Sequence, residues 1–383
     1  MKRIYLDHAA SPPLDPEVKQ VMDEVQVRAW ANASSLHAEG REARGVIDDA
    51  RDQIAKILDV ETDNLVFTSG ATESNVLALR GVLEYVRLKG SRPHLVLSKI
   101  EHPSLKEPAE QLQKMGLDIT WVGVDKNGLV DPKELTDSIK DNTALVSIIY
   151  GNHETGVVQD IPGLVKAVKS KNANVLFHTD AAQSLGWLDF KIKDLGVDLL
   201  TASSYKLYGA KGIGLLYLNS NVKIHPLFPG VQEWGIRGGT ESTALIAGMA
   251  RALELSSQWP RSQVRDLRNY LISKVTQKIP DVLVNTYLEK SLPHIAHFSF
   301  AGIEADSLTI ALDRAGVAAS PGSACSSGSV KVSHIIEALG IDVEKYSGSL
   351  RLSLGINTTQ EEIDKAVGIL EKVVSDLRAN VVK

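Results

Sequence analysis

Short apolar runs alternate with amphipathic stretches through the middle of this chain. The apolar runs predict strands at residues 65–68, 94–98, 118–124, 144–150, 175–180, 197–203 and 212–218. Apolar residues at helical spacing predict helices between them, which end near Lys89, cover 104–115, 132–140 and 161–171, and begin again near Ala181. This alternation is typical of an α/β protein with a mainly parallel, doubly wound sheet, in which ligands bind beyond the carboxyl ends of the strands.

The two ends of the chain follow a different order of elements. The first part predicts an extended segment at 4–6 and helices at 16–29 and 38–58. A helix at 243–258 closes the α/β region, and Pro260 marks a boundary. Beyond it the pattern predicts a smaller α+β domain, with helices at 262–278, 304–315, 331–339 and 360–379 and strands at 282–286, 294–300 and 349–354. The length of 383 residues also suggests two domains, a large one over 15–258 and a small one that includes 259–383.

The amino-acid composition and the net charge exclude some classes of binding partner. The hydrophobic fraction of 43% is ordinary for a globular protein, and the net charge of −5 includes no block of like charges. These values argue against nucleic acid or an acidic membrane surface as the main partner. No stretch approaches the roughly 18 apolar residues of a membrane span, and Asp7 lies where a signal peptide needs its apolar core. We therefore expect a cytoplasmic protein.

Polar residues follow the ends of several predicted strands. Lys206 comes just after the run 197–203, and Asp180 ends the strand before it. A lysine and an aspartate on adjacent strand ends suit pyridoxal phosphate (PLP): the lysine holds its aldehyde as a Schiff base, and the aspartate keeps its pyridine nitrogen protonated. Other strand ends carry further residue types that PLP chemistry uses, namely His102, Asn152 and Gln183. The sequence therefore predicts a PLP enzyme, with no metal site.

The turn at 69–75 lies between a predicted strand and a predicted helix. It contains Gly70 and several small hydroxyl residues, and the N–H groups at a helix N-terminus bind anions such as phosphate. The alternative is an ordinary helix N-cap, with Thr72 or Ser74 as the capping residue. The polar loop at 30–37 is by itself best interpreted as a helix cap and linker.

Cys325 is the only cysteine of the chain, so no internal disulfide forms. A single cysteine is either a buried apolar residue or a reactive thiol. Apart from Pro321 and Cys325, every residue from 318 to 329 is Gly, Ala or Ser, and such a run offers no bulky side chain to bury. We therefore interpret Cys325 as a functional nucleophile, which acts as the thiolate.

Several motifs together resemble one family. They are the segments 5–7, 69–74, 101–102, 180–183 and 322–325, with Asn152, Ser203-x-x-Lys206 and Arg237-x-Gly239-Thr240. They span nearly the whole chain and resemble the NifS/IscS-type cysteine desulfurases, which are class V aminotransferase-like PLP enzymes of fold type I. The resemblance implies that residues 1–14 join the small domain. The chain departs from the family pattern at Ala33, Val76, His153 and Tyr205.

The resemblance also implies a role for each matching residue. Lys206 holds the cofactor, Asp180 pairs with its pyridine nitrogen, Gln183 bonds its phenolic oxygen, and His102 stacks on its ring and moves protons. The phosphate is bound by Thr72 and Ser203, and by Thr240 from the partner subunit of a homodimer. Ala71 also belongs to the cofactor site, and Tyr205, although it departs from the family pattern, has a hydroxyl that can donate to the phosphate. Asn152 contacts cofactor and substrate. The carboxylate of the substrate is bound by Asn32 and Arg351, and an arginine fork suits a carboxylate better than a lysine does.

The implied reaction converts L-cysteine to L-alanine. Lys206 removes the Cα proton, the Cys325 thiolate attacks the substrate sulfur, and the resulting persulfide passes sulfur to an acceptor protein or thiol. The acceptor pathway is left open between iron–sulfur cluster assembly, transfer-RNA thiolation and cofactor synthesis. The alternatives are a selenocysteine lyase or another class V PLP enzyme, and a sulfur-transfer scaffold that has lost catalysis.

Overall fold

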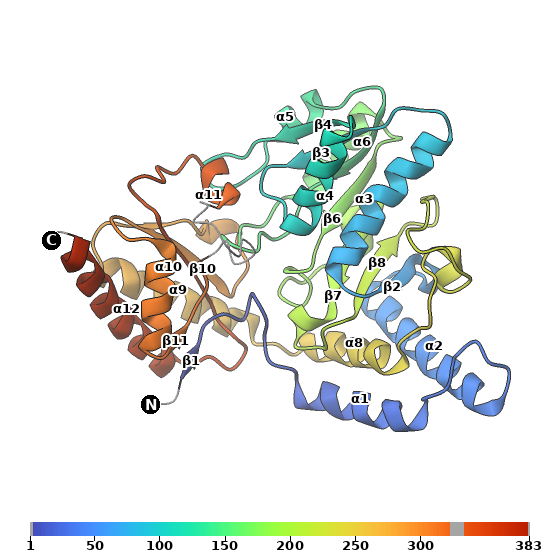
Figure 1. The fold of residues 1–383 in the computed structure, drawn as a ribbon, viewed down its shortest axis with the longest axis horizontal. Helices are drawn as coiled ribbons and strands as arrows, with labels where there is room; N and C mark the ends of the chain where they lie inside the picture. The colour runs from blue at the N-terminus through green and yellow to red at the C-terminus, as the bar shows by residue number, and fades with distance from the viewer. Residues whose placement is uncertain (1–2, 322–332, 382–383) are drawn as a thin grey trace.

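A seven-stranded sheet forms the centre of the larger part of the molecule (Figure 1). The computed structural model describes residues 3–321 and 333–381. The strand order is β2-β8-β7-β6-β5-β3-β4. The bounds are β2 Leu65–Thr68, β3 His94–Ser98, β4 Asp118–Val122, β5 Thr143–Ser147, β6 Leu176–Asp180, β7 Leu199–Ser203 and β8 Gly214–Leu218. The predicted α/β fold with a mainly parallel sheet is confirmed.

Only β8 interrupts the parallel order of this sheet among the described strands. The strands from β7 to β4 are parallel, whereas β8 is antiparallel to both β7 and β2. Residues 204–213 connect β7 to β8, and this connection is too short for a parallel crossover, which needs a dozen residues or more. The short return keeps Lys206 at the carboxyl end of β7.

Helices cover both faces of the sheet. On one face, Leu95 and Leu97 of β3 pack into a core with α3 and α4, while Val96 belongs to the core of the opposite face. That opposite core contains α6, α8, α1 and α2. Strands that are buried on both faces explain the continuous apolar runs in the sequence. The helix bounds are α1 Pro16–Arg28, α2 Ala38–Leu58, α3 Ala71–Leu88, α4 Pro103–Lys114, α6 Ile161–Lys171 and α8 Thr243–Ser256.

The smaller part contains a three-stranded antiparallel sheet in the order β12-β10-β9. Its elements are α9 Arg261–Lys278, β9 Val282–Val284, β10 Ile295–Phe300, α10 Ala305–Arg314, β11 Val317–Ala318, α11 His334–Ala338, β12 Gly348–Ser353 and α12 Gln360–Val381. Short helical segments elsewhere are η1 Thr62–Asn64, α5 Pro132–Asp137, α7 Ile192–Leu195, η2 Ser204–Leu207, η3 Glu233–Gly235 and η4 Leu288–Lys290.

The N-terminal segment lies against this smaller part. β1 (Ile4–Tyr5) pairs in parallel with β11, and Asp7 forms an isolated bridge with Ser353. Figure 1 shows the chain leaving β1 on this side and crossing to α1 below the large sheet. These pairings support the expectation that the N-terminal segment joins the small domain, and the domain boundaries near residues 14 and 258 stay predictions.

One predicted helix is wrong. The chain after β6 does not continue as a helix from Ala181 but makes tight turns, in which the N–H groups of Ser184 and Leu185 both donate to the Ala181 carbonyl. Gly186 then adopts a φ of +84°, and a Cβ there would lie 2.6 Å from Leu207 Cδ2. A glycine in this left-handed conformation ends the helical path, so that Gln183 stays beside the strand ends.

No helix within residues 3–321 and 333–381 combines the length and the apolar character that crossing a membrane requires.

Candidate active site

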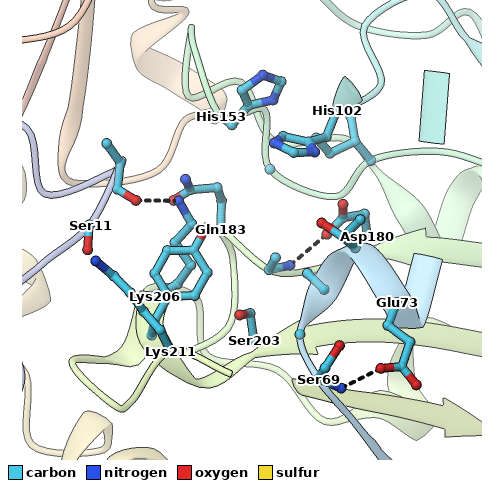
Figure 2. Close-up of a pocket in the computed structure, with 18 of the residues that line it drawn as sticks. Ser11, Ser69, Glu73, His102, His153, Asp180, Gln183, Ser203, Lys206 and Lys211 are labelled. Atoms are coloured by element: carbon cyan, nitrogen blue, oxygen red, sulfur yellow. Dashed lines mark hydrogen bonds between the residues drawn. The ribbon is translucent and has the colours of Figure 1, made fainter. Parts of the chain in front are cut away.

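A pocket of about 450 Å³ lies beyond the carboxyl ends of the central strands (Figure 2). β6 ends in Asp180, β7 is followed directly by Lys206, and the turn after β2 leads into α3. The structure brings eight of the predicted residues together as lining of this pocket: Ala71, Thr72, His102, Asp180, Gln183, Ser203, Tyr205 and Lys206. Residues from distant parts of the sequence therefore meet where a doubly wound sheet binds its ligands.

The N-terminus of α3 is open at one end of the pocket. Gly70 is the N-cap, at a φ of 153°, and no side chain caps the helix. Ser74 bonds Thr68 instead, with its Oγ 2.7 Å from Thr68 Oγ1, so the interpretation of Thr72 or Ser74 as an ordinary cap is wrong. The uncapped first turn of an 18-residue helix offers backbone N–H groups and the positive end of the helix dipole to an anion.

A glycine on β8 lets this turn lie close to the sheet. A Cβ on Gly214 would lie 2.6 Å from both the Cα and the carbonyl carbon of Gly70. Any larger residue would therefore push the turn away from β8. The close backbone approach places Ala71 and Thr72 opposite Ser203 in the same pocket.

Ser203 supplies a second group for an anion at this end. Its side chain is buried, and its Oγ has no hydrogen-bond partner within the described structure. A buried hydroxyl without a partner is costly, and a phosphate oxygen would satisfy it. The open helix N-terminus and this hydroxyl together fit the phosphate of PLP.

Lys206 and Gln183 converge on one backbone carbonyl. Lys206 Nζ donates to the carbonyl oxygens of Ala9 at 2.5 Å and Ala10 at 3.0 Å, and Gln183 Nε2 donates to that of Ala9 at 2.7 Å. Lys206 is partly buried on η2, and its Nζ lies 4.6 Å from the centre of the Tyr205 ring. The amine and the amide therefore lie close together, as they must if they are to reach the adjacent aldehyde and phenolic oxygen of PLP.

Asp180 is the last residue of β6, and both of its carboxylate oxygens accept hydrogen bonds. Its Oδ1 accepts from Ala182 N at 2.9 Å, and its Oδ2 accepts from Asn75 Nδ2 at 2.7 Å. A carboxylate offers about four lone-pair sites, so two such bonds leave capacity for one more donor. A protonated pyridine nitrogen is such a donor, and Asp180 therefore fits the PLP ring.

Two histidine rings meet at the edge of the pocket above Asp180 in Figure 2. The rings of His102 and His153 lie edge to face, with their centres 4.7 Å apart. Burial lowers the pKa of His102, although the Asp180 carboxylate acts in the opposite direction. Burial also lowers the pKa of His153 well below its usual value, and His153 Nδ1 has no partner in the described structure. Both imidazoles are therefore neutral at pH 7.

The residue that precedes His102 in the chain, Glu101, has a buried carboxyl. Glu101 Oε1 accepts from Ser98 Oγ at 2.5 Å and from Ile149 N at 2.8 Å, while Oε2 has no partner among the described residues. Burial raises the pKa of Glu101 to about 8. Glu101 is therefore uncharged at neutral pH.

Asn152 and Arg351 are not among the described residues that line the pocket. Asn152 Oδ1 accepts from Glu154 N and from the N and Oγ1 of Thr155, and its Nδ2 donates to Ile100 O, so the side chain holds its own turn together. The buried Arg351 donates to the His153 carbonyl at 2.6 Å and to Asp7 Oδ1 at 3.0 Å. Their predicted contacts with cofactor and substrate stay predictions.

Two other predicted residues, Asn32 and Thr240, are also not among the residues that line the described pocket. Asn32 is exposed in the loop before α2, and its Oδ1 accepts from Ser34 N at 2.9 Å, as a local turn requires. Thr240 is exposed in the segment before α8. Cys325 lies outside the described residues.

The pocket also includes residues for which no role was predicted from the sequence. They are chiefly Ser11, Glu73, His153 and Lys211. Glu73 accepts from Ser69 N at 2.8 Å and pairs with Arg237, whose Nε lies 2.9 Å from its Oε1. His153 could have been found from its position between Asn152 and Glu154 just after a strand, whereas Ser11 shows no sequence signal.

Comparisons with known proteins show which family this chain resembles in sequence and in fold. Residues 4–366 match the family model described as aminotransferase class V. The cysteine desulfurase IscS of Dictyoglomus turgidum is 41% identical, over 99% of this chain and 96% of the relative. A solved NifS-like protein superposes with a TM-score of 0.90 at 32% identity and covers 98% of this chain and all of that one. A structure described as SspA in complex with cysteine has a TM-score of 0.82 at 32% identity, with 93% of this chain and all of that one covered.

Proposed function

This chain belongs to the class V aminotransferase family, and on that premise we propose that it is a cysteine desulfurase. The proposed reaction takes L-cysteine to L-alanine and places the sulfur on Cys325 as a persulfide. The family is PLP-dependent, and PLP when bound supplies an electron sink for the charge left on the substrate Cα. A relative that is 41% identical over nearly the full chain is a cysteine desulfurase, and a structural neighbour binds cysteine.

One observation in the structure carries the proposal most strongly. A single pocket combines the partly buried amine of Lys206, the Asp180 carboxylate and an uncapped helix N-terminus beside the unpartnered Ser203 hydroxyl. An amine, a carboxylate and an anion site match the three distinct ends of PLP. The same pocket continues past His102 to His153, which leaves room for a substrate side chain.

Three residues of this chain then act on the substrate. Lys206 would accept the Cα proton at Nζ, and this role is supported by the position of the amine, which donates to the backbone carbonyls of Ala9 and Ala10 at the edge of the pocket. Arg351 orients the carboxylate of L-cysteine, a role supported by the carboxylate that it holds now, that of Asp7. The Cys325 thiolate attacks the substrate sulfur, and the persulfide passes to an acceptor protein or thiol.

The test measures alanine from L-cysteine with the wild-type protein, Cys325→Ser and Lys206→Ala. We expect alanine from the wild type and almost none from either variant, with PLP absorbance retained in Cys325→Ser. L-Selenocysteine in place of L-cysteine tests the main alternative, because C–Se cleavage does not need a thiol nucleophile. Equal alanine from the wild type and Cys325→Ser would contradict the role of Cys325.

We also propose that the active form is a homodimer in which Thr240 reaches the phosphate of the partner subunit. Two ion pairs attach the segment before α8 to α2: Arg51 Nη2 lies 2.7 Å from Glu233 Oε1, and Arg44 Nη2 lies 2.9 Å from Glu241 Oε2. Large apolar side chains are exposed on this segment and beside α2, and such exposure often marks a protein interface. They are Val27 (80%), Trp30 (70%), Leu36 (89%), Phe228 (54%) and Val231 (86%).

A reducing compartment suits an enzyme that works through one reactive thiolate, since such a thiol stays unpaired there. We therefore propose that the protein acts in the cytoplasm. The sulfur acceptor is proposed to serve iron–sulfur cluster assembly or transfer-RNA thiolation, and the name IscS among its relatives supports the first.

A further inference from the structure

A continuous line of hydrogen bonds joins Asp180 to His102 through two side chains outside the proposed catalytic set. Asp180 Oδ2 lies 2.7 Å from Asn75 Nδ2, and the same Nδ2 lies 2.8 Å from Ser104 Oγ. Ser104 Oγ lies 2.8 Å from His102 Nδ1. The line thus links residues on β6, α3 and α4 to the residue that caps α4.

The chemistry of these groups determines which atom donates in each bond. A carboxylate oxygen only accepts, so Asn75 must direct its amide NH₂ toward Asp180. The second hydrogen of that NH₂ goes to Ser104 Oγ, which leaves the hydroxyl hydrogen for His102 Nδ1. The backbone N–H of Ser104 also donates to His102 Nδ1, at 3.1 Å. Nδ1 therefore accepts twice, and the proton of the neutral ring lies on Nε2.

The side chains of Asn75 and Ser104, which lie between Asp180 and His102 in this line, are held in place by burial. Asn75 is fully buried on the first turns of α3, and Ser104 is 8% exposed on the first turn of α4. These helices pack against each other on the same face of the sheet. A buried polar group keeps its partners because water cannot replace them, so the line is part of the fold.

We propose that Asn75 and Ser104 are positioning residues that hold His102 with its proton on Nε2 and connect its ring to Asp180. The place of His102 in desulfuration rests on the proposed function, whereas the line of bonds does not. In this state Nε2 offers a hydrogen bond, and no lone pair, to a group in the pocket. His102 thus acts as a donor rather than a general base.

Several other groups also act on the charge of His102. Burial lowers its pKa, and the charges of Lys206 on η2 and Arg351 on β12 lower it further, whereas Asp180 on β6 raises it. His334 on α11 acts in the lowering direction only when it is protonated, and burial lowers the pKa of His334 itself. The neutral ring of His153 contacts it from the 151–158 turn. Ser104 adds a donor that favours the neutral ring, since a hydrogen bond given to Nδ1 competes with protonation there.

The first test is an NMR measurement on the full-length, PLP-loaded protein with ¹⁵N-labelled histidine and no substrate. The His102 signals are assigned by their loss in His102→Gln. We expect a protonated Nε2 and an unprotonated Nδ1. A proton on Nδ1 in the wild type would overturn the proposal, and this result needs no substitution at Asn75 or Ser104. Because no turnover is measured, this outcome is independent of whether the protein desulfurates cysteine.

The second test compares the pKa of His102 in Ser104→Ala and Ser104→Thr by the same method. Loss of one hydroxyl donor is expected to raise the pKa by about one unit in Ser104→Ala, while Ser104→Thr keeps the wild-type value. Ser256→Ala is the control, because it removes a buried hydroxyl that donates to Leu253 O on α8. A His102 pKa that is equal in the wild type and Ser104→Ala would refute the role of Ser104.

Discussion

Glu101 should make the folded protein less stable as the pH rises. Its carboxyl is fully buried, and burial raises its pKa from 4.5 to about 8. In the unfolded chain the same carboxyl ionises near its ordinary pKa. The substitution Glu101→Gln keeps the size of the side chain and an oxygen for Ser98 Oγ and Ile149 N, but it cannot ionise.

The sign and the size of this change in the free energy of unfolding follow from the linkage between proton binding and folding. A carboxyl whose folded pKa is raised contributes its full stability below pH 4.5 and loses it as the pH rises toward 8. One pKa unit corresponds to about 1.4 kcal/mol, so between pH 5 and pH 7.5 Glu101 should cost the wild type about 3 kcal/mol that Glu101→Gln does not lose. Buried histidines with lowered pKa values act in the opposite direction, and the difference between the two proteins removes their contribution.

The assay is urea unfolding of wild type and Glu101→Gln at pH 5, 6, 7 and 7.5, without PLP. The stability of the variant relative to the wild type should rise with every step in pH. Glu107→Gln is a matched control, because Glu107 is an exposed glutamate on α4. A difference between Glu101→Gln and wild type that stays constant over this range would mean that Glu101 ionises normally in the folded state, and the argument from burial would fail.

Two further predictions concern the cofactor and the dimer. Ser203→Ala should weaken PLP binding roughly 10- to 150-fold, since a bond to a charged phosphate contributes about 1.5–3 kcal/mol, yet leave the PLP-free protein as stable as wild type because that hydroxyl has no partner there. Absorbance titration and urea unfolding measure both, and loss of stability without loss of affinity would contradict it. Trp30→Glu should shift sedimentation from dimer to monomer, whereas Leu88→Glu, at another exposed apolar residue on α3, should not. Monomeric wild type would refute the proposed interface.

The sequence predicted the location of a side chain best where that side chain lies at the end of a predicted strand. Lys206 and Asp180 follow or end apolar runs that are buried on both faces, so the parallel sheet had to bring them to one edge. The anion site at the turn before α3 was predicted for the same reason, because this turn follows a predicted strand. The helix expected from Ala181 failed because helical spacing of apolar residues says nothing of the contact between Gly186 and Leu207, which only the folded chain creates.

The line from Asp180 to His102 was beyond sequence reasoning for a different reason. Asn75 lies 29 positions from Ser104 and 105 from Asp180, and neither asparagine nor serine early in a helix is unusual. Only the packing of α3 against α4 makes the three side chains neighbours. Sequence pattern predicts which edge of the sheet a residue reaches, whereas the partner of each donor depends on tertiary contacts.

Arg351 is the clearest example of the difference between what a residue type predicts and what tertiary contacts determine. Its residue type predicted a carboxylate partner, and the folded chain gives it one, although that carboxylate is Asp7 rather than a substrate. Asp7 is 344 positions away and arrives because the N-terminal segment pairs with β11 and Asp7 itself bridges Ser353, two residues beyond Arg351. The preference of a guanidinium for a carboxylate is a property of the side chain. Which carboxylate satisfies it is a property of the fold, and a substrate that binds Arg351 must share or replace the contact with Asp7.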